Sequence, residues 1–528
     1  MESYWVWTSV ATLLTCYIFV NIFLRRLNGW YYDLKLRKKQ HPLPLGDMGW
    51  PIIGNLLSFI KDFSSGHPDL FIKNLVTKYG RTGIYKTHLL GMPTIIVCVP
   101  DLCKRVLTDD MNFKFGYPKA TLKLAPSKTL YDVSTAEHRR LRRLVTAPIV
   151  GQNSLTMYIE RIEEIVIDSL EEMSSMKHPV EILKETENVS LKVILHIFMG
   201  SKNDYLVSRI GDLFSDMHNA IFSLFPINLP GFAFHKALKA RKKLMKILES
   251  IVEERRSTMK KDQKGDKEDL IDILLQIDGE NGEKLGDEDI IDLLIGLLFG
   301  GRQSTAFGMM WTLKYLAQHP HLFQKAKDEQ EEIMKTRQPS QKHLSFKEIK
   351  QMNYTSQVID EMLRHANLAF TSFREATADV NINGCLYSSQ NYKFFISSYL
   401  QLLKENKRIY MSCSYSNILG YIVPKGWRVL AWVSAIHMDP EYYSNPEEFN
   451  PSRWDDYNAK AGTFLPFGAG SRICPGSDLA KLEISIMLHY FLLNYKLELV
   501  NPHCPLACLP TIKPADNCLA KVTKISSP

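Results

Sequence analysis

The sequence predicts a mainly α-helical fold with small β-sheets, preceded by a single N-terminal transmembrane helix. Three observations lead to this prediction. An apolar stretch without formal charge runs from Tyr4 to Leu24, most of the chain from about Phe71 to Phe370 carries apolar residues at helical spacing, and strand-like runs lie only near the ends of that region. With 528 residues, 45% of them hydrophobic, the chain can bury one large core or two smaller ones.

The apolar N-terminal stretch is long enough to cross a bilayer as one helix. Basic residues follow it, at Arg25, Arg26, Lys35, Arg37, Lys38 and Lys39. Positive charge on this side predicts that the body of the protein stays cytosolic, and the lack of basic residues before the stretch argues against the alternative, a cleaved signal peptide. We expect an anchor over 1–24, a basic and proline-rich connector over 25–55 and one large domain over 56–528.

Charge and cysteine content exclude some classes of protein. The net charge of +8 comes from 65 basic and 57 acidic residues. This surplus is too diffuse to indicate nucleic-acid binding, and it is compatible with binding to a membrane surface or an acidic partner, or with an ordinary solvated surface. The nine cysteines show no C-x-x-C pair and no regular spacing, so neither a zinc site nor a disulfide framework is predicted.

A long buried helix is predicted from near Asp287 to the stop at His319-Pro320, because this stretch is apolar on most sides. Gly300 and Gly301 interrupt its centre, where each glycine costs about 1 kcal/mol relative to alanine. Two explanations remain open: the close approach of another helix, or a groove for a ligand lying against the helix.

The segment "FGAGSRICPGSDLA", Phe467 to Ala480, places one cysteine in a glycine-rich loop before a helix-like run. A planar cofactor reaches a sulfur ligand only without side-chain obstruction, and Gly468, Gly470 and Gly476 are expected to give that clearance. The helix that follows favours a negative sulfur at its N-terminus. An isolated buried cysteine would not explain this pattern.

The segment resembles the cytochrome P-450 superfamily, whose haem-ligand signature F-x-x-G-x-R-x-C-x-G is met at Phe467, Gly470, Arg472, Cys474 and Gly476. The resemblance implies the cytochrome P-450 fold, a haem-thiolate monooxygenase domain over 56–528, and haem b with Cys474 as the axial thiolate that favours O–O cleavage. It also implies electrons from NADPH through a cytochrome P-450 reductase, which would dock on a basic face near Cys474.

Further residues match the superfamily. "EMLR" and "FNPSRW" supply Glu361, Arg364 and Arg453, which the resemblance makes a structural network on the haem-proximal side. The resemblance assigns the haem propionates to residues of three segments: His138, Arg142, Arg374 and Arg472. Read without the family, His138 and Arg142 would be surface charges on a basic helix.

One position departs from the family. At the kink of the long helix, members of the family carry an acid followed by an alcohol, and the two side chains help deliver protons for oxygen chemistry. This chain has Gln303 at the acid position, followed by Ser304 and Thr305. An amide does not readily relay protons. We expect slower or uncoupled oxygen chemistry, tested by peroxide release in a Gln303→Glu variant.

A second departure is an insert, Cys385 to Gly420. Without it, "ATADVNING" and "YIVPKGWRVLAWV" would form a hairpin across Asn383-Gly384. We interpret the insert as a retained intron or an aberrant splice product; a native surface loop is the alternative, because lengthening such a loop costs little entropy.

Segments including "GDMGWPIIGN" and "SFIKDFSSGHPD" resemble plant terpenoid oxidases, the legume β-amyrin 11-oxidases first and the ent-kaurenoic acid oxidases second. The resemblance implies triterpenoid biosynthesis at the endoplasmic reticulum membrane, with oxidation of β-amyrin at C-11 to the alcohol and then to 11-oxo-β-amyrin. Alternatives are ent-kaurenoic acid oxidation, a haem-thiolate isomerase or dehydratase, and an inactive splice variant. Candidate chamber walls are the segment before His138, the turn from Phe222 to Phe234, and the helix face at Leu297 and Leu298.

Overall fold

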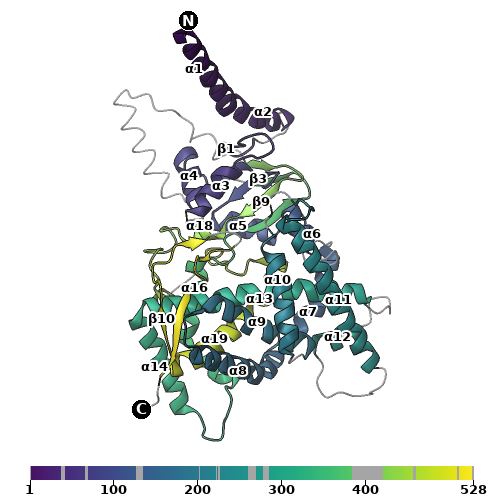
Figure 1. Ribbon diagram of the computed structural model, residues 1–528, viewed down its shortest axis with the longest axis vertical. Coiled ribbons are helices and arrows are strands. Elements are labelled where there is room, and N and C mark those ends of the chain that lie inside the picture. The colour runs from purple at the N-terminus through teal and green to yellow at the C-terminus, as the bar shows by residue number, and fades with distance from the viewer. Residues whose placement is uncertain are drawn as a thin grey trace.

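The computed structural model describes residues 2–36, 42–65, 69–125, 135–200, 203–221, 223, 226–259, 269–276, 285–382, 420–455, 460–507 and 511–525. At the N-terminus, α1 (Glu2–Ile18), the π-helical η1 (Phe19–Leu24) and α2 (Arg25–Leu36) project from the body (Figure 1). By length and composition, Tyr4–Leu36 is a candidate membrane span with none of its apolar window buried. This exposed apolar helix fits the expected anchor.

The connector after α2 is tied to the body. The Asn28 side chain donates to the carbonyls of Met48 (2.9 Å) and Trp50 (3.1 Å), and Arg25 pairs with Asp47 at 2.7 Å. Asp47 lies in β1 (Gly46–Asp47), which joins the main sheet. These contacts hold α2 close to the body.

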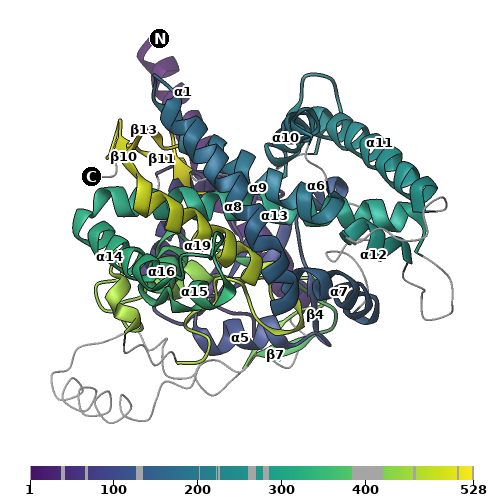
Figure 2. The same ribbon diagram turned by 90° about the horizontal axis from the view of Figure 1, so that it is seen from below.

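Most of the body is helical, and the fold class predicted from the sequence is confirmed. Figure 2 shows α13 in the middle, with α10, α11 and α12 grouped at one edge. The helices α9 and α19 pack against α13, and α8 packs against α9 and α19. The helices of the body are α3 (Leu56–Ser64), α4 (Leu70–Tyr79), α5 (Pro100–Thr108), α6 (Lys119–Leu124), α7 (Thr135–Val150), α8 (Gln152–Ser175), α9 (Ile182–Met199), α10 (Asp204–His218), α11 (Ala233–Met259), α12 (Leu270–Gln276), α13 (Asp287–Gln318), α14 (Pro320–Thr336), α15 (Phe346–Gln351), α16 (Asn353–Ala366), α18 (Val433–His437) and α19 (Ser477–Asn494).

The long helix α13 begins at Asp287 and ends before His319-Pro320, as predicted. It also passes the length and composition test for a membrane span, but 67% of its apolar window is buried, so it is the core helix of the body. A Cβ at Gly301 would lie 2.7 Å from Ile194 Cδ1 of α9, so the glycine permits close helix packing. Gly300 and Gly301 also line a cavity, so both explanations of the paired glycines hold.

A six-stranded mixed sheet lies at the end of the body nearest the N-terminal helix (Figure 1). Its order is β1, β2 (Ile84–Leu89), β3 (Met92–Val97), β9 (Arg428–Ala431), β6 (Ser372–Ala376) and β4 (Phe113–Phe115). In register, Thr94 is opposite Arg428 in a parallel pair, and Arg374 is opposite Val429 in an antiparallel pair. The sheet thereby brings Arg374 and β4 to the edge of the helical body.

Smaller sheets complete the fold. A three-stranded sheet joins β10 (Tyr495–Leu499), β13 (Leu519–Lys524) and β5 (Val180–Glu181), and β11 (Leu506–Ala507) pairs with β12 (Lys513–Pro514). The strands β7 (Val380–Ile382) and β8 (Tyr421–Val423) pair antiparallel, with Ile382 opposite Tyr421, so the predicted strand pair forms. The insert from Cys385 lies outside the described residues up to residue 419.

Candidate cofactor and active site

The cysteine loop connects the 3₁₀ turn η3 (Gly470–Arg472) to α19. The Cys474 N–H donates to the Phe467 carbonyl at 2.9 Å, which closes the loop, and Gly476 immediately precedes the helix. Cys474, Phe467 and Arg472 line one cavity of about 400 Å³. Four of the five signature residues, Phe467, Arg472, Cys474 and Gly476, therefore line the same cavity.

The three loop glycines serve different purposes. A Cβ at Gly468 or Gly476 would meet nothing within 4 Å, and both residues line the cavity, as the clearance argument expects. Gly470 differs, because a Cβ there would lie 2.7 Å from the carbonyl oxygen of Leu107 in α5. With φ at 76°, in the left-handed region, Gly470 lets the loop pack closely on α5.

Burial raises the pKa of the Cys474 thiol, while the Gly476 N–H and the Arg142 charge lower it. The helix N-terminus thus acts in the direction expected from the sequence but does not outweigh burial. A coordinated metal ion deprotonates a thiol outright. Thiolate formation at Cys474 therefore depends on metal ligation.

A cluster of basic side chains surrounds Phe115 at one side of the cavity. The guanidinium carbons of Arg374 and Arg472 lie 4.9 and 4.6 Å from the centre of the Phe115 ring. Arg142, from α7, donates to the Ile473 carbonyl and also lines the cavity. His138 is 2% exposed, and burial together with Arg472 lowers its pKa to about 4.

This basic cluster fits the two carboxylates of a haem group. Asp110 lies 3.4 Å from Arg472 but balances only part of the charge. Among the described residues, neither Nη2 of Arg472 nor Nδ1 of His138 has a hydrogen-bond partner, although both atoms are buried. Buried polar groups are almost always satisfied. The chain therefore supplies a thiol ligand, an unsatisfied cationic donor on Arg472 and an unsatisfied imidazole nitrogen on His138 in one cavity, as bound haem requires.

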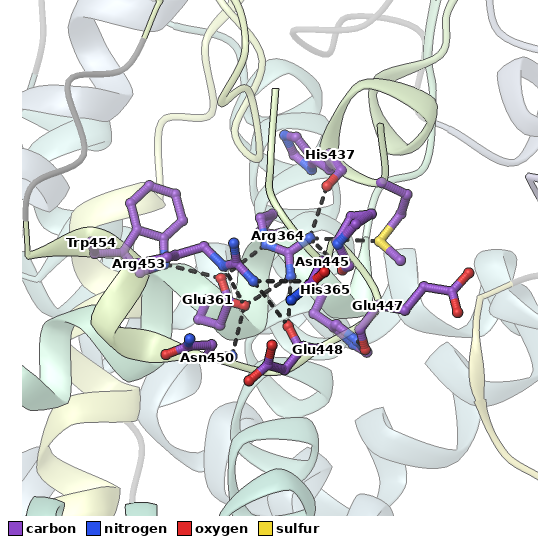
Figure 3. A network of polar contacts seen from close by, with 12 residues as sticks. Glu361, Arg364, His365, His437, Asn445, Glu447, Glu448, Asn450, Arg453 and Trp454 are labelled. Atoms are coloured by element: carbon purple, nitrogen blue, oxygen red, sulfur yellow. Dashed lines mark hydrogen bonds and ion pairs between the residues drawn. The ribbon is translucent and has the colours of Figure 1, made fainter. Parts of the chain in front are cut away.

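Glu361, Arg364 and Arg453 form the expected network, drawn in Figure 3. Arg364 donates to both carboxylate oxygens of Glu361, at 2.9 and 2.8 Å, and both side chains are fully buried. Arg453, in η2 (Pro451–Trp454), donates to Glu361 at 2.9 Å, and the Trp454 indole donates at 3.1 Å. Glu361 is thus held by three side chains.

The network also reaches the cysteine loop through His437, which the sequence reading missed. Arg364 donates to the His437 carbonyl at 2.8 Å (Figure 3). The His437 Nε2 accepts the Leu465 N–H at 3.1 Å, and its Nδ1 pairs with the Asn367 side-chain oxygen at 2.9 Å. Burial and Arg364 lower the pKa of His437 to about 3, so the ring is the neutral acceptor that Leu465 needs.

The residues of α13 predicted to act together face two different cavities, although the helix is continuous from Asp287 to Gln318. Ser304 and Thr305 line the cofactor cavity, and the Ser304 hydroxyl donates to the Gly300 carbonyl at 2.8 Å. Gln303 lines a second, polar cavity of about 830 Å³ instead. Its Nε2 donates to Glu187 of α9 at 3.3 Å, and Arg302 donates to the same carboxylate at 2.8 Å.

The wall of the cofactor cavity away from the basic cluster is apolar. It comprises Ile194 and Phe198 of α9, Leu293 and Leu297 of α13, and Leu368 after α16. Leu297 was predicted, whereas Leu298 is buried in the core and does not line the cavity. The described part of the turn at 222–234 does not line it either, and residues 126–134 before His138 lie outside the described residues.

Comparisons with known proteins agree with this geometry. The profile of the cytochrome P-450 family matches residues 44–406 and 411–516. The chain belongs to the cytochrome P-450 family. It is therefore an oxidoreductase of the monooxygenase class, with haem-thiolate iron as the cofactor that the family implies.

Among its relatives, a β-amyrin 11-oxidase of Glycyrrhiza uralensis is 64% identical over 528 residues, which cover all of both chains. An ent-kaurenoic acid oxidase of Arabidopsis thaliana is 45% identical over 501 residues, covering 95% of this chain and 94% of the relative. A cyanobacterial P-450 solved with retinoic acid bound matches with a TM-score of 0.76 at 25% identity, over 92% of this chain and 100% of that one.

Proposed function

We propose that this P-450 oxidises β-amyrin at C-11, first to the alcohol and then to 11-oxo-β-amyrin. The single observation that carries the proposal is the 64% identity, over the whole of both chains, to a β-amyrin 11-oxidase. Each of the two oxidations would use one NADPH and one O₂, with electrons passed on by a cytochrome P-450 reductase. Anchored by its N-terminal helix, the enzyme would work on the cytosolic face of the endoplasmic reticulum.

The lining of the cavity supports an apolar substrate. β-Amyrin is almost wholly hydrocarbon, whereas ent-kaurenoic acid carries a carboxylate that needs a cation when buried. In the described lining, Arg374, Arg472 and His138 lie around Phe115, where they fit the haem carboxylates, and Arg142 donates to the Ile473 carbonyl. Lys481 also lines the cavity but is paired with Asp360 at 2.6 Å. Ile194, Phe198, Leu293 and Leu297 offer no charge. This distribution favours the triterpene over the acid.

Haem bound in the cavity would supply the chemistry that inserts one oxygen atom of O₂ into a C–H bond and reduces the other to water. In this proposal Cys474 ligates it, while Arg142, Arg374, Arg472 and His138 hold its carboxylates. The apolar wall orients the substrate and excludes water, which strengthens polar interactions inside the chamber. Ser304 and Thr305 of α13 line this cavity, and their hydroxyl groups would take part in proton delivery there.

The test is turnover in microsomes that contain the full-length chain and a plant P-450 reductase. We expect a thiolate-type band in the reduced carbon monoxide difference spectrum, and NADPH- and O₂-dependent conversion of β-amyrin to the 11-hydroxy and 11-oxo products. Cys474→Ser is the control for thiolate ligation. Turnover of ent-kaurenoic acid alone would overturn the substrate, turnover without NADPH and O₂ would indicate an isomerase or dehydratase, and failure to bind haem would indicate an inactive splice product.

A further inference from the structure

Phe115 lies at the centre of the basic cluster, although its side chain can bind neither iron nor a carboxylate. It belongs to β4 and lines the cofactor cavity. The guanidinium carbons of Arg374 and Arg472 lie over its ring, 4.9 and 4.6 Å from the ring centre. One ring thus contacts two like charges, on residues that are only 4% and 8% exposed.

The backbone of the main sheet fixes the ring beside Arg374. In the antiparallel pair of β4 and β6, Phe115 is directly opposite Arg374, so both side chains lie on the same face of the sheet. A Cβ at Gly116 would lie 2.2 Å from the Arg374 carbonyl oxygen, so this glycine allows the two strands to approach closely. Tyr117 stacks on Phe115, with the ring centres 5.5 Å apart. The position of the ring is therefore set by the sheet and its neighbours, and the arginines meet it there.

The two guanidinium groups are only partly balanced by acid. Asp110 lies 3.4 Å from Nε of Arg472, whereas Arg374 donates to the Phe373 carbonyl at 3.1 Å. Burial, together with the charge of Arg472, lowers the pKa of Arg374 to about 10, so the group stays cationic at neutral pH but at a cost. The electron-rich face of an aromatic ring attracts a cation, and more strongly when both are desolvated. The Phe115 ring therefore stabilises both charges without adding an anion to the cavity.

We propose that Phe115 is a positioning residue for the cofactor, because the face of its ring holds the guanidinium groups of Arg374 and Arg472 in the arrangement that binds the two haem carboxylates. An acidic side chain in its place would also stabilise the arginines, but it would repel those carboxylates. Without the ring, Arg472 turns toward Asp110, and the binding arrangement forms for only a fraction of the time. The apparent affinity for the cofactor falls by that fraction. The inference rests on haem binding in the proposed function and adds a residue outside the cysteine signature to the cofactor site.

The test changes the electron density of the ring while its shape is nearly kept. Phe115 is replaced in the full-length chain by trifluoro- and then pentafluorophenylalanine, because fluorine withdraws electron density from the ring face. We expect haem transfer from the detergent-solubilised protein to excess apomyoglobin to accelerate with each step, by about tenfold for the pentafluoro ring, since one desolvated cation–π contact is equivalent to roughly a tenfold change in an equilibrium constant. A role in packing alone predicts no change. Equal rates for the three rings would overturn the proposal.

Phe115→Leu removes the ring and keeps an apolar side chain. We expect this variant to lose haem at least as fast as the pentafluoro protein. It should also lower the midpoint potential of the haem iron, because carboxylates that are less well paired leave more negative charge near the metal. Wild-type haem loss and potential in F115L would overturn the proposal, and the fluorinated rings provide the reading if F115L does not fold.

The matched control is pentafluorophenylalanine at Phe373. This phenylalanine is 6% exposed, lies in the same sheet and has the Arg428 guanidinium carbon 6.0 Å from its ring centre, but it does not line the cavity. We expect the control to keep the wild-type rate of haem loss, and equal acceleration at both positions would show a general effect on the sheet and overturn the proposal. Haem loss is measured without substrate, reductase or NADPH, so failure of β-amyrin oxidation leaves the result standing. Failure of the wild-type chain to bind haem would overturn both proposals.

Discussion

Gln303→Glu should destabilise the protein in a pH-dependent manner, although it restores the acid of the family pattern. The reason is Glu187, whose carboxylate accepts from the Gln303 amide at 3.3 Å and from Arg302 at 2.8 Å. The variant replaces a donor by a second acceptor. One guanidinium would then face two carboxylates.

The size of the effect follows from the distance. Two carboxylates 3.3 Å apart repel by about 5 kcal/mol at an effective dielectric constant of about 20. Protonating one of the two carboxylates at neutral pH, from an ordinary pKa near 4.3, costs about 4 kcal/mol. Because protonation removes the repulsion, the loss of unfolding free energy cannot exceed this value. The folded protein then binds more protons than the unfolded chain, so the loss is absent below about pH 4 and grows as the pH rises through the raised pKa of the pair.

The assay is unfolding of the haem-loaded protein in detergent, followed by circular dichroism at neutral pH and near pH 5. The double variant Q303E/E187Q transposes the carboxylate and the amide, so it should recover most of the lost stability. Equal stability of Q303E and wild type at neutral pH, or an equal loss at both pH values, would refute the reasoning. Peroxide release from Q303E tests separately whether Gln303 slows proton delivery, which stays a prediction.

Three further predictions follow from the structure. Glu361→Gln should cost about 3–5 kcal/mol of unfolding free energy and reduce haem retention, because it leaves Arg364 buried with a neutral partner. Urea unfolding measures the free energy and the Soret absorbance measures the bound haem, and wild-type values of both would contradict the expectation. Deletion of 385–420 should keep the thiolate spectrum and the melting temperature, because Ile382 and Tyr421 are directly opposite and Asn383-Gly384 would close them as a two-residue hairpin; loss of haem binding would show that the insert is required. Acidification below about pH 6.5 should lower the free energy of unfolding by up to about 1.4 kcal/mol per pH unit through His437, because its pKa is about 3 in the folded protein and the unfolded chain binds the proton first. His437→Gln should flatten this pH dependence in unfolding titrations, and an unchanged slope would assign it to other groups.

The sequence predicted the parts of the fold that rest on local pattern. The length of α13 followed from its apolar run and the proline stop, and β2, β3, β8 and β9 followed from β-branched runs. Within the region of helical spacing, α15 and α16 are separate helices that meet at Met352, because Met352 leaves the helical region with ψ at 63°. The strands β5, β10 and β13 were not predicted, since their pairing joins segments far apart in the chain.

The candidate site shows the same limit. The motif of Cys474 and Arg472 was readable because its spacing is local, whereas Arg142 and Arg374 followed from the family resemblance. The structure brings all four residues to one cavity. Phe115 and His437 were missed, because a phenylalanine and a histidine without a local pattern acquire their roles only from tertiary contacts. Gln303 was read at the expected position, but the direction of its side chain depends on Glu187, more than one hundred residues earlier.

The basic cluster around Phe115 makes cofactor supply a condition for the lifetime of the protein in the cell. Before haem arrives, Arg374 and Arg472 repel each other, with Asp110 as a counter-charge, so the folded state holds buried positive charge that is only partly balanced. A ligand that binds only the folded state stabilises it by mass action. Chains synthesised faster than haem is supplied would therefore be cleared by proteolysis, and haem availability would set how much of this enzyme a tissue accumulates.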